Sequence, residues 1–133
     1  MKKINIIQTV NDLSSSSGGP TKTVLSLSKY LNKETNLRLI SNKIKVANSS
    51  YLNNFNQINI KYNQPKFIYN PLYDLALEKL ISSFKLDSKN TVMHDNGLWL
   101  PFNNTISKIC MKQSIPQVIS SHGMLEPWSL NYR

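Results

Sequence analysis

The chain has 133 residues, a formal net charge of +9 and 40% hydrophobic residues, a composition that indicates one globular domain and excludes a disordered chain. Sixteen Lys and Arg stand against seven Asp and Glu, but only Arg38 and Arg133 are arginine. Nucleic-acid readers favour arginine, so we expect no nucleic-acid partner. The chain has a single cysteine, Cys110, which excludes a disulfide framework and a multi-cysteine metal site. We expect its side chain to be buried and to pack in the core.

Strand and helix patterns alternate along the first half of the chain. Pro20 suits the first turn of a helix, and an apolar stripe of Val24, Leu27 and Leu31 follows it at helical spacing. The predicted elements are a strand over residues 3–10, a polar loop over 11–19, a helix over 20–33, a strand over 37–41 and a strand through Ile58, Ile60 and Tyr62.

The same alternation continues in the second half. Asn70 and Pro71 form a cap followed by a first helical turn. The apolar residues that follow at helical spacing are Leu72, Leu75, Ala76, Leu80 and Phe84. The predicted elements are a helix over residues 70–85, a strand over 91–94, a loop over 95–102, a helix over 104–113 and a strand over 117–120.

Strands that alternate with helices predict an α/β fold, an open parallel sheet with helices on both faces. Residues 4–10 are too short and too polar for the core of a secretory signal, and no run approaches the ~20 apolar residues that cross a bilayer. We therefore expect a cytoplasmic protein. Residues 128–133 resemble the opening turns of a helix without a terminating signal, which favours a fragment of a longer protein.

Three loops that carry polar and aromatic residues follow predicted strands, at residues 11–20, 94–102 and 121–128. Ligands bind beyond the carboxyl ends of the strands in an open parallel sheet. Because these ends meet at one edge, the three loops are expected to gather there and to form a site.

The first loop ends in Gly18, Gly19 and Pro20, where the next helix begins. Glycines let the backbone approach a ligand, and a helix start offers unpaired N–H groups and a partial positive charge. A phosphate or a sugar hydroxyl would suit this position. The spacing matches neither a P-loop nor G-x-G-x-x-G, and a plain connection is the alternative.

The two histidines of the chain, His94 and His122, both stand at strand ends on this edge, which favours a functional role because imidazole transfers protons near neutral pH. The alternative for His94 is a structural histidine. Trp99 either stacks on a sugar or covers the sheet edge, and Glu126 either accepts ligand hydroxyls or belongs to a helix-entry turn. Metal-ligand spacing and a G-x-S-x-G elbow are missing, so we expect no metal, no cofactor and no hydrolase.

Together, the three loops resemble the N-terminal domain of bacterial group 1 glycosyltransferases (family 4, GT-B fold). The resemblance extends in order and spacing from Lys3 to Trp128, and its most specific part is the run from Gly123 to Trp128. The matching segments are Gly18-Gly19-Pro20, His94-Asp95-Asn96-Gly97-Leu98-Trp99-Leu100-Pro101 and Ser121-His122-Gly123-Met124-Leu125-Glu126-Pro127-Trp128.

The resemblance implies a Rossmann-like domain that takes part in retaining transfer of a sugar from a nucleotide-sugar donor to a glycan or lipid-linked acceptor in surface polysaccharide biosynthesis. It implies that His122 lies near the reacting sugar as the catalytic residue. It implies substrate-binding roles for Gly18, Gly19, Pro20, His94, Asn96, Trp99 and Glu126. Asn96 stands where a His is common in the family, and Ser121 stands where a Pro is common, so the roles of residues 94–96 are less defined.

The resemblance also implies that residues 1–133 are the acceptor-side domain and that the donor-binding C-terminal domain is absent from this sequence. Stabilising the departing diphosphate is a large catalytic contribution, so this chain alone is expected to have little activity. The lysine excess either supports peripheral association with the inner face of the cell membrane or is a solvated coat. The alternative function is a non-catalytic nucleotide or sugar-phosphate binding module.

Overall fold

The computed structural model describes residues 3–14, 18–43, 56–59 and 70–131. Within these ranges the chain forms a five-stranded, all-parallel sheet in the order β3-β2-β1-β4-β5. The strands are β1 (Asn5–Asp12), β2 (Asn36–Lys43), β3 (Asn56–Asn59), β4 (Thr91–Asn96) and β5 (Gln117–Ser120). The helices are α1 (Gly19–Glu34), α2 (Pro71–Ser83), α3 (Pro101–Gln113) and α4 (Pro127–Leu130), with a 3-10 turn η3 (Ser88–Asn90).

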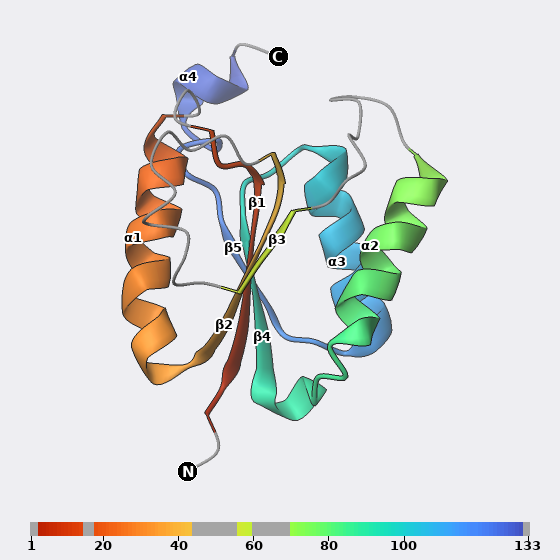
Figure 1. Cartoon of the computed structure of the whole chain (residues 1–133). Helices are drawn as coiled ribbons and strands as arrows, with labels where there is room; N and C mark the ends of the chain where they lie inside the picture. The colour runs from red at the N-terminus through yellow and green to blue at the C-terminus, as the bar shows by residue number, and fades with distance from the viewer. Residues whose placement is uncertain (1–2, 15–17, 44–55, 60–69, 132–133) are drawn as a thin grey trace.

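Helices cover both faces of the sheet. Figure 1 shows the sheet edge-on, with α1 against one face and α2 and α3 against the other. The strand order reverses beside β1, which pairs with β2 on one side and with β4 on the other. The predicted open parallel α/β sheet is therefore confirmed, and it is Rossmann-like. The carboxyl ends of the strands lie at the end of the molecule where α1 and α3 begin and where α4 lies (Figure 1).

Several predicted elements have different ends in the structure. β1 continues to Asp12, although the loop was expected from residue 11, because β2 remains paired to that point. β4 likewise includes Asp95 and Asn96, which the sequence predicted as loop, since both are paired with neighbouring strands. α3 begins at Pro101 rather than at residue 104.

The third predicted strand is found at Asn56–Asn59. Two of the residues that defined its predicted alternation, Ile60 and Tyr62, lie outside the described residues. The final predicted strand is confirmed with its predicted bounds, Gln117–Ser120. The helix expected at residues 128–133 is found as the single turn α4, and residues 132–133 lie outside the described part of the chain.

Asn70 caps α2 as predicted. Its side-chain Oδ1 accepts hydrogen bonds from the backbone N–H groups of Leu72 and Tyr73, at 3.1 and 3.4 Å. Pro71 follows in the first turn, where its missing N–H leaves no hydrogen bond unmade. The Asn-Pro pair therefore fixes where this helix begins.

The apolar residues at helical spacing in α2 do not all face the sheet. Leu72 is 72% exposed and Leu75 is also exposed, whereas the face against the sheet carries Tyr73, Leu77 and Ile81. Apolar residues surround most of this helix, so more than one stripe has helical spacing. The stripe that packs on the sheet begins with Tyr73. The hydroxyl of Tyr73 forms a hydrogen bond with Asn42 at the end of β2.

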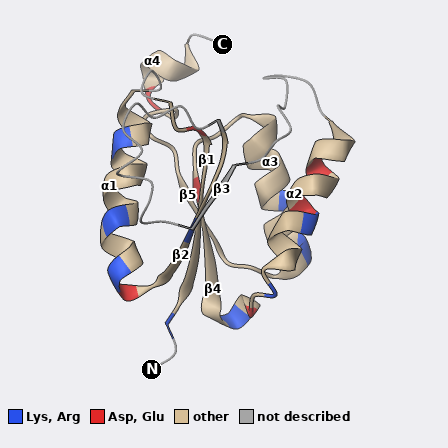
Figure 2. Ribbon diagram, in the orientation of Figure 1, with Lys and Arg blue, Asp and Glu red and all other residues tan. Residues whose placement is uncertain are grey.

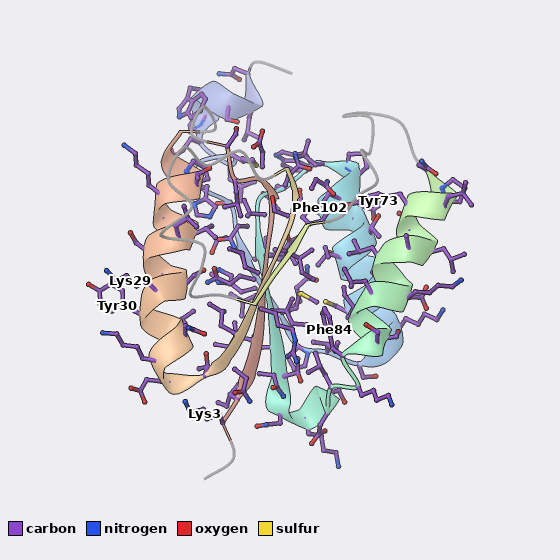
Figure 3. All side chains as sticks on the ribbon, viewed as in Figure 1. Lys3, Lys29, Tyr30, Tyr73, Phe84 and Phe102 are labelled. Carbon is purple, nitrogen blue, oxygen red and sulfur yellow. The ribbon has the colours of Figure 1, made fainter. Side chains whose placement is uncertain are left out.

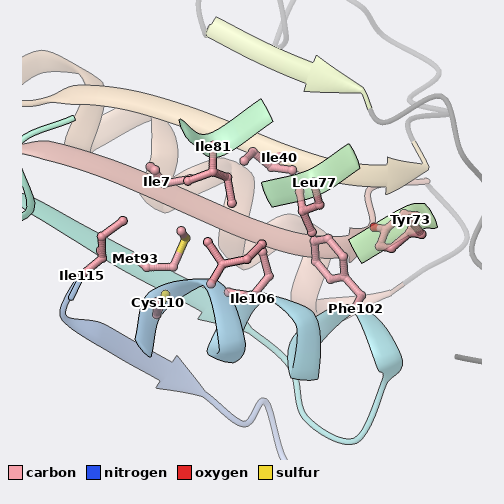
Figure 4. Close-up of a cluster of buried hydrophobic side chains, with 11 residues drawn as sticks. Ile7, Ile40, Tyr73, Leu77, Ile81, Met93, Phe102, Ile106, Cys110 and Ile115 are labelled. Carbon is pink, nitrogen blue, oxygen red and sulfur yellow. The ribbon is translucent and has the colours of Figure 1, made fainter. Parts of the chain in front are cut away.

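The main core lies between the sheet and helices α2 and α3 (Figure 4). Cys110 is buried in it, as predicted, and burial raises the pKa of its thiol to about 12. The core residues are Ile7, Ile40, Tyr73, Leu77, Ile81, Met93, Phe102, Ile106, Ile109, Cys110 and Ile115. This packing fixes β4 and the start of α3, the two elements that flank the loop over residues 97–100.

The face of α1 that meets the sheet is more polar than predicted. Val24 is buried, but Leu27 is exposed, and the buried face also carries Thr21 and Ser28. The hydroxyl of Ser28 donates a 2.7 Å hydrogen bond to Oε1 of Gln8, which is fully buried in β1. The opposite face of α1 points to solvent, as Figure 3 shows for Lys29 and Tyr30.

The basic residues in the described part of the chain are spread over several elements. Figure 2 shows Lys and Arg distributed along α1, on α2 and α3 and near the amino end of the sheet. Lys112 of α3 forms an ion pair with Glu78 of α2. In the described ranges, no helix is long and apolar enough to span a membrane.

Candidate functional site

The loops that follow β4 and β5 are joined by direct contacts at the carboxyl edge. The backbone N–H of Gly97 donates to the carbonyl of Ser120 at 2.9 Å. The backbone N–H of Leu98 lies 3.1 Å from Sδ of Met124, its acceptor. The predicted convergence of these two loops is therefore confirmed.

His122 is hydrogen-bonded to Asn96 across this junction. The distance from His122 Nε2 to Asn96 Oδ1 is 2.9 Å. The amide nitrogen of Asn96, which is nearly buried, donates to the backbone carbonyls of Thr9 and His94. Because Asn96 Oδ1 can only accept, Nε2 of His122 carries the hydrogen, and Nδ1 is the ring atom that can accept a ligand hydroxyl.

Two of the predicted site residues have a left-handed backbone. The φ angle is 48° at His122 and 69° at Trp99. The other non-glycine residues with positive φ in the described ranges are Lys85 and Ser114. Such angles cost about 1–2 kcal/mol for a residue with a Cβ. Both loops therefore hold a large side chain in a backbone conformation that the rest of the fold must stabilise.

His94 lies next to this pair but faces inward. Its Nε2 is 2.8 Å from Ser120 Oγ, and its Nδ1 is 3.3 Å from the amide nitrogen of Gln8. An amide nitrogen can only donate, so Nδ1 accepts and the hydrogen of the neutral ring is on Nε2. Burial, together with the nearby His122, lowers the pKa of His94. These contacts favour the structural alternative for His94, a neutral ring that positions the ends of β4 and β5.

The amide of Gln8 holds His94 in this neutral form, which gives a testable result. Gln8→Glu places a carboxylate beside Nδ1, where it stabilises the protonated ring. We expect the pKa of His94 to rise relative to its value in the wild type. NMR titration of the imidazole carbon protons measures this value, and Gln113→Glu on the surface of α3 is the matched control. An unchanged pKa of His94 in Gln8→Glu would show that this contact does not set its protonation.

Asp95 points to the opposite face of the sheet from His94, since side chains alternate along a strand. It is 1% exposed and accepts hydrogen bonds from Thr9 Oγ1 at 2.6 Å and from Asn103 Nδ2 at 3.0 Å. Burial raises its pKa to about 6, against the lowering effect of these hydrogen bonds. Asp95 was not among the predicted site residues. The sequence signal for it was a carboxylate directly after the strand predicted over residues 91–94.

The raised pKa of Asp95 predicts a pH-dependent stability. Between the unfolded value near 3.8 and the folded value of about 6, the folded chain binds more protons than the unfolded chain. Stability must therefore fall as the pH rises through this window. Relative to Asp95→Asn, we expect the free energy of unfolding of the wild type to fall by up to about 3 kcal/mol between pH 4 and pH 7. Urea denaturation at both pH values measures it, and a constant difference would contradict the expectation.

Gly18, Gly19 and Pro20 lie where α1 begins, at the same end of the sheet (Figure 1). Gly18 has φ 76°, which favours glycine, and a Cβ added at Gly18 or Gly19 would meet no atom within 4 Å. The backbone is therefore open to a ligand here. Within the described residues, no hydrogen bond joins residues 18–20 to His122.

Trp99 and Glu126 are both exposed. Trp99 is 52% exposed, so neither of its two predicted roles is excluded by burial. Glu126 lies directly before α4 and its side chain makes no capping hydrogen bond there. It therefore occupies the helix-entry turn without capping the helix. Among the described residues, no group of three or more His, Cys, Asp or Glu side chains is placed to hold a metal ion.

Comparisons with known proteins support the fold. No protein-family model matches the chain, and no curated protein matches it. Among solved structures, the C-terminal domain of a hydrogenase from Pyrococcus furiosus is similar, with a TM-score of 0.57 over 90% of this chain and 94% of that domain. The two chains share 8% sequence identity. At this identity the likeness shows a shared fold alone.

Proposed function

We propose that the chain is the acceptor-side domain of a retaining glycosyltransferase, which transfers a sugar from a nucleotide-sugar to a glycan or lipid-linked acceptor in surface polysaccharide biosynthesis. The observation that carries the proposal is the hydrogen bond between His122 and Asn96 at the carboxyl edge of the sheet. It joins the two segments on which the sequence resemblance mainly rests. The open backbone at Gly18 and Gly19 lies at the same end of the sheet.

Each part of this edge has a role in the proposed reaction. The acceptor oxygen bonds to the anomeric carbon while the bond from that carbon to the diphosphate breaks on the same face of the ring. The hydroxyl proton leaves with the diphosphate. His122 contacts the reacting sugar through Nδ1, since Nε2 is held by Asn96. The N–H groups at the start of α1 are suited to the diphosphate charge.

Exposed apolar side chains at the same end support contact with further structure. The large exposed residues there are Trp99, Leu125, Trp128 and Leu130. Side chains of this kind on a rim suit an interface or an acceptor with an apolar part. In the proposed enzyme, a donor-binding domain faces this end and supplies the charge that stabilises the departing diphosphate.

Transfer by the complete gene product that contains these residues tests the proposal. Membranes from cells that express this gene product, or the purified protein, are mixed with a lipid extract of the source cells. Each mixture is then incubated with one of four radiolabelled donors, UDP-glucose, UDP-galactose, UDP-N-acetylglucosamine or GDP-mannose. We expect label in a glycan or lipid product with the anomeric configuration of the donor. Calorimetry of the 133-residue chain with UDP is the companion measurement, and we expect no tight binding. Tight UDP binding by this chain, without transfer by the complete protein, would instead identify a binding module.

A further inference from the structure

Three hydrogen-bonded side chains fix how one amide group faces the carboxyl edge beside β1. Nδ2 of Asn42 in β2 donates to Oδ1 of Asn11 in β1 at 2.7 Å. The hydroxyl of Tyr73, in the first turn of α2, is hydrogen-bonded to Oδ1 of the same Asn42. In the register of the sheet, Asn11 comes directly after Val10, which pairs with Asn96 of β4. Asn11 therefore stands at the end of the strand beside which the strand order reverses, the place where open parallel sheets bind ligands.

The burial of Tyr73 sets the direction of these hydrogen bonds. Tyr73 is fully buried in the core (Figure 4), and among the described residues Asn42 is the one hydrogen-bond partner of its hydroxyl. Burial raises the pKa of this hydroxyl well above its usual range, so the hydroxyl keeps its proton. If the hydroxyl accepted from Asn42, that proton would be buried without an acceptor, which costs free energy. The hydroxyl therefore donates, and the side-chain oxygen of Asn42 faces it.

Asn42 passes this direction on to Asn11. An amide side chain has an oxygen on one side and an NH2 group on the other. Because the oxygen of Asn42 faces Tyr73, its NH2 group faces Asn11, which accepts through Oδ1. The NH2 group of Asn11 is then the outer end of the series. Nothing in the described residues accepts a hydrogen bond from it, and its nitrogen is not fully buried, so this group is open to a ligand.

The open NH2 group narrows the class of ligand atom. It donates two hydrogen bonds, accepts none and carries no charge. It suits an oxygen that has lone pairs and no hydrogen of its own, because the hydrogen of a hydroxyl would need a separate acceptor. Phosphate oxygens and the carbonyl oxygen of an acetamido group are of this kind. Nucleotide-sugars contain the first in their diphosphate and, where the sugar is N-acetylated, the second as well.

We propose that Asn11 is a substrate-binding residue whose NH2 group donates to a phosphate or acetamido oxygen of the sugar donor, and that Asn42 and Tyr73 are positioning residues that hold this amide in place. The assignment to the sugar donor rests on the proposed function, whereas the orientation of the amide does not. The residues for which the sequence resemblance implies substrate binding include none of these three.

NMR of the 15N-labelled 133-residue chain tests the orientation without any ligand. We expect the side-chain NH2 signals of Asn42 to be protected from exchange with water and those of Asn11 to exchange quickly. Asn42→Asp puts an oxygen in place of the inner NH2 group, so Asn11 must turn its own NH2 group inward. The Asn11 signals should then gain at least tenfold protection. Fast exchange at Asn42 with protection at Asn11 in the wild type would overturn the proposed direction.

Titration of the same chain with pyrophosphate and with N-acetylglucosamine tests the ligand. We expect saturable shifts of the Asn11 NH2 signals with at least one of the two, and the active ligand identifies the source of the oxygen. Asn11→Leu, which removes the polar group without adding charge, should weaken this binding at least tenfold. Asn42→Asp should weaken it as strongly, although Asn11 itself is unchanged. Asn104→Leu and Asn104→Asp, at an exposed position of α3, are the matched controls and should bind as the wild type does.

Kinetics of the complete gene product separate this proposal from the proposed function. There we expect Asn11→Leu to lower kcat/KM for the sugar donor at least tenfold. No saturable shift with either ligand, or binding by Asn11→Leu within twofold of the wild type, would overturn the role of Asn11. Transfer with an unchanged kcat/KM in Asn11→Leu would reject that role while the enzyme stands. Binding at Asn11 without transfer by the complete protein would reject the enzyme alone.

Discussion

Replacing His122 by asparagine in the complete gene product is expected to lower kcat for sugar transfer about 100-fold or more, the contribution that a positioned acid–base or hydrogen-bonding group makes. Asparagine is chosen because it tolerates the left-handed backbone that His122 adopts, at φ 48°. The variant therefore removes the imidazole without imposing a new backbone strain. Initial rates of nucleoside diphosphate release, at saturating donor and acceptor, give kcat directly.

Ser114→Asn is the matched control for this variant. Ser114 also has a left-handed backbone, at φ 53°, but it lies at the carboxyl end of α3, where no site is proposed. Its kcat should equal that of the wild type. If His122→Asn retains kcat within about threefold of the wild type, a barrier change under ~1 kcal/mol, His122 is not a catalytic residue.

The second large expected effect concerns the core that holds β4 and α3 in place. Leu77→Ala should lower the free energy of unfolding by about 2–5 kcal/mol, because Leu77 is fully buried between α2 and the sheet and its removal leaves a cavity. Urea denaturation followed by circular dichroism measures this loss. Since small domains are stable by only about 5–15 kcal/mol, the variant should be close to unfolding at 37 °C.

Leu72→Ala makes the same chemical change five residues earlier on the same helix. Leu72 is 72% exposed, so the expected loss is within about 0.5 kcal/mol. The contrast tests which face of α2 meets the sheet. Equal losses in the two variants, or a larger loss in Leu72→Ala, would show that α2 packs through its other face.

Local signals in the sequence predicted the order and type of the elements. The Asn70-Pro71 pair fixes a helix start because its cap and its proline act within a few residues. The placement of His94 and His122 at one edge follows from strand polarity alone. These features depend on neighbours in sequence or on a general property of parallel sheets, so no three-dimensional information was needed for them.

Features that depend on contacts between distant segments were not predictable in the same way. The hydrogen bond from His122 to Asn96 needs the loop after β5 to fold over the end of β4. The burial of Asp95 depends on Thr9 in β1 and Asn103 in α3, which are far apart in sequence. The polar face of α1 likewise follows from Gln8, whose side chain is satisfied by Ser28 and His94.

We infer that the carboxyl edge of this sheet is the reacting end of a sugar-transfer enzyme. Hydrogen-exchange mass spectrometry of the complete gene product, with and without saturating nucleotide-sugar donor, tests it most directly. We expect donor-dependent protection of the segments at residues 18–21, 96–99 and 121–126, and none at the amino edge around residues 35–38. Protection confined to the amino edge, or no change at these three segments in a protein that turns over, would contradict the claim.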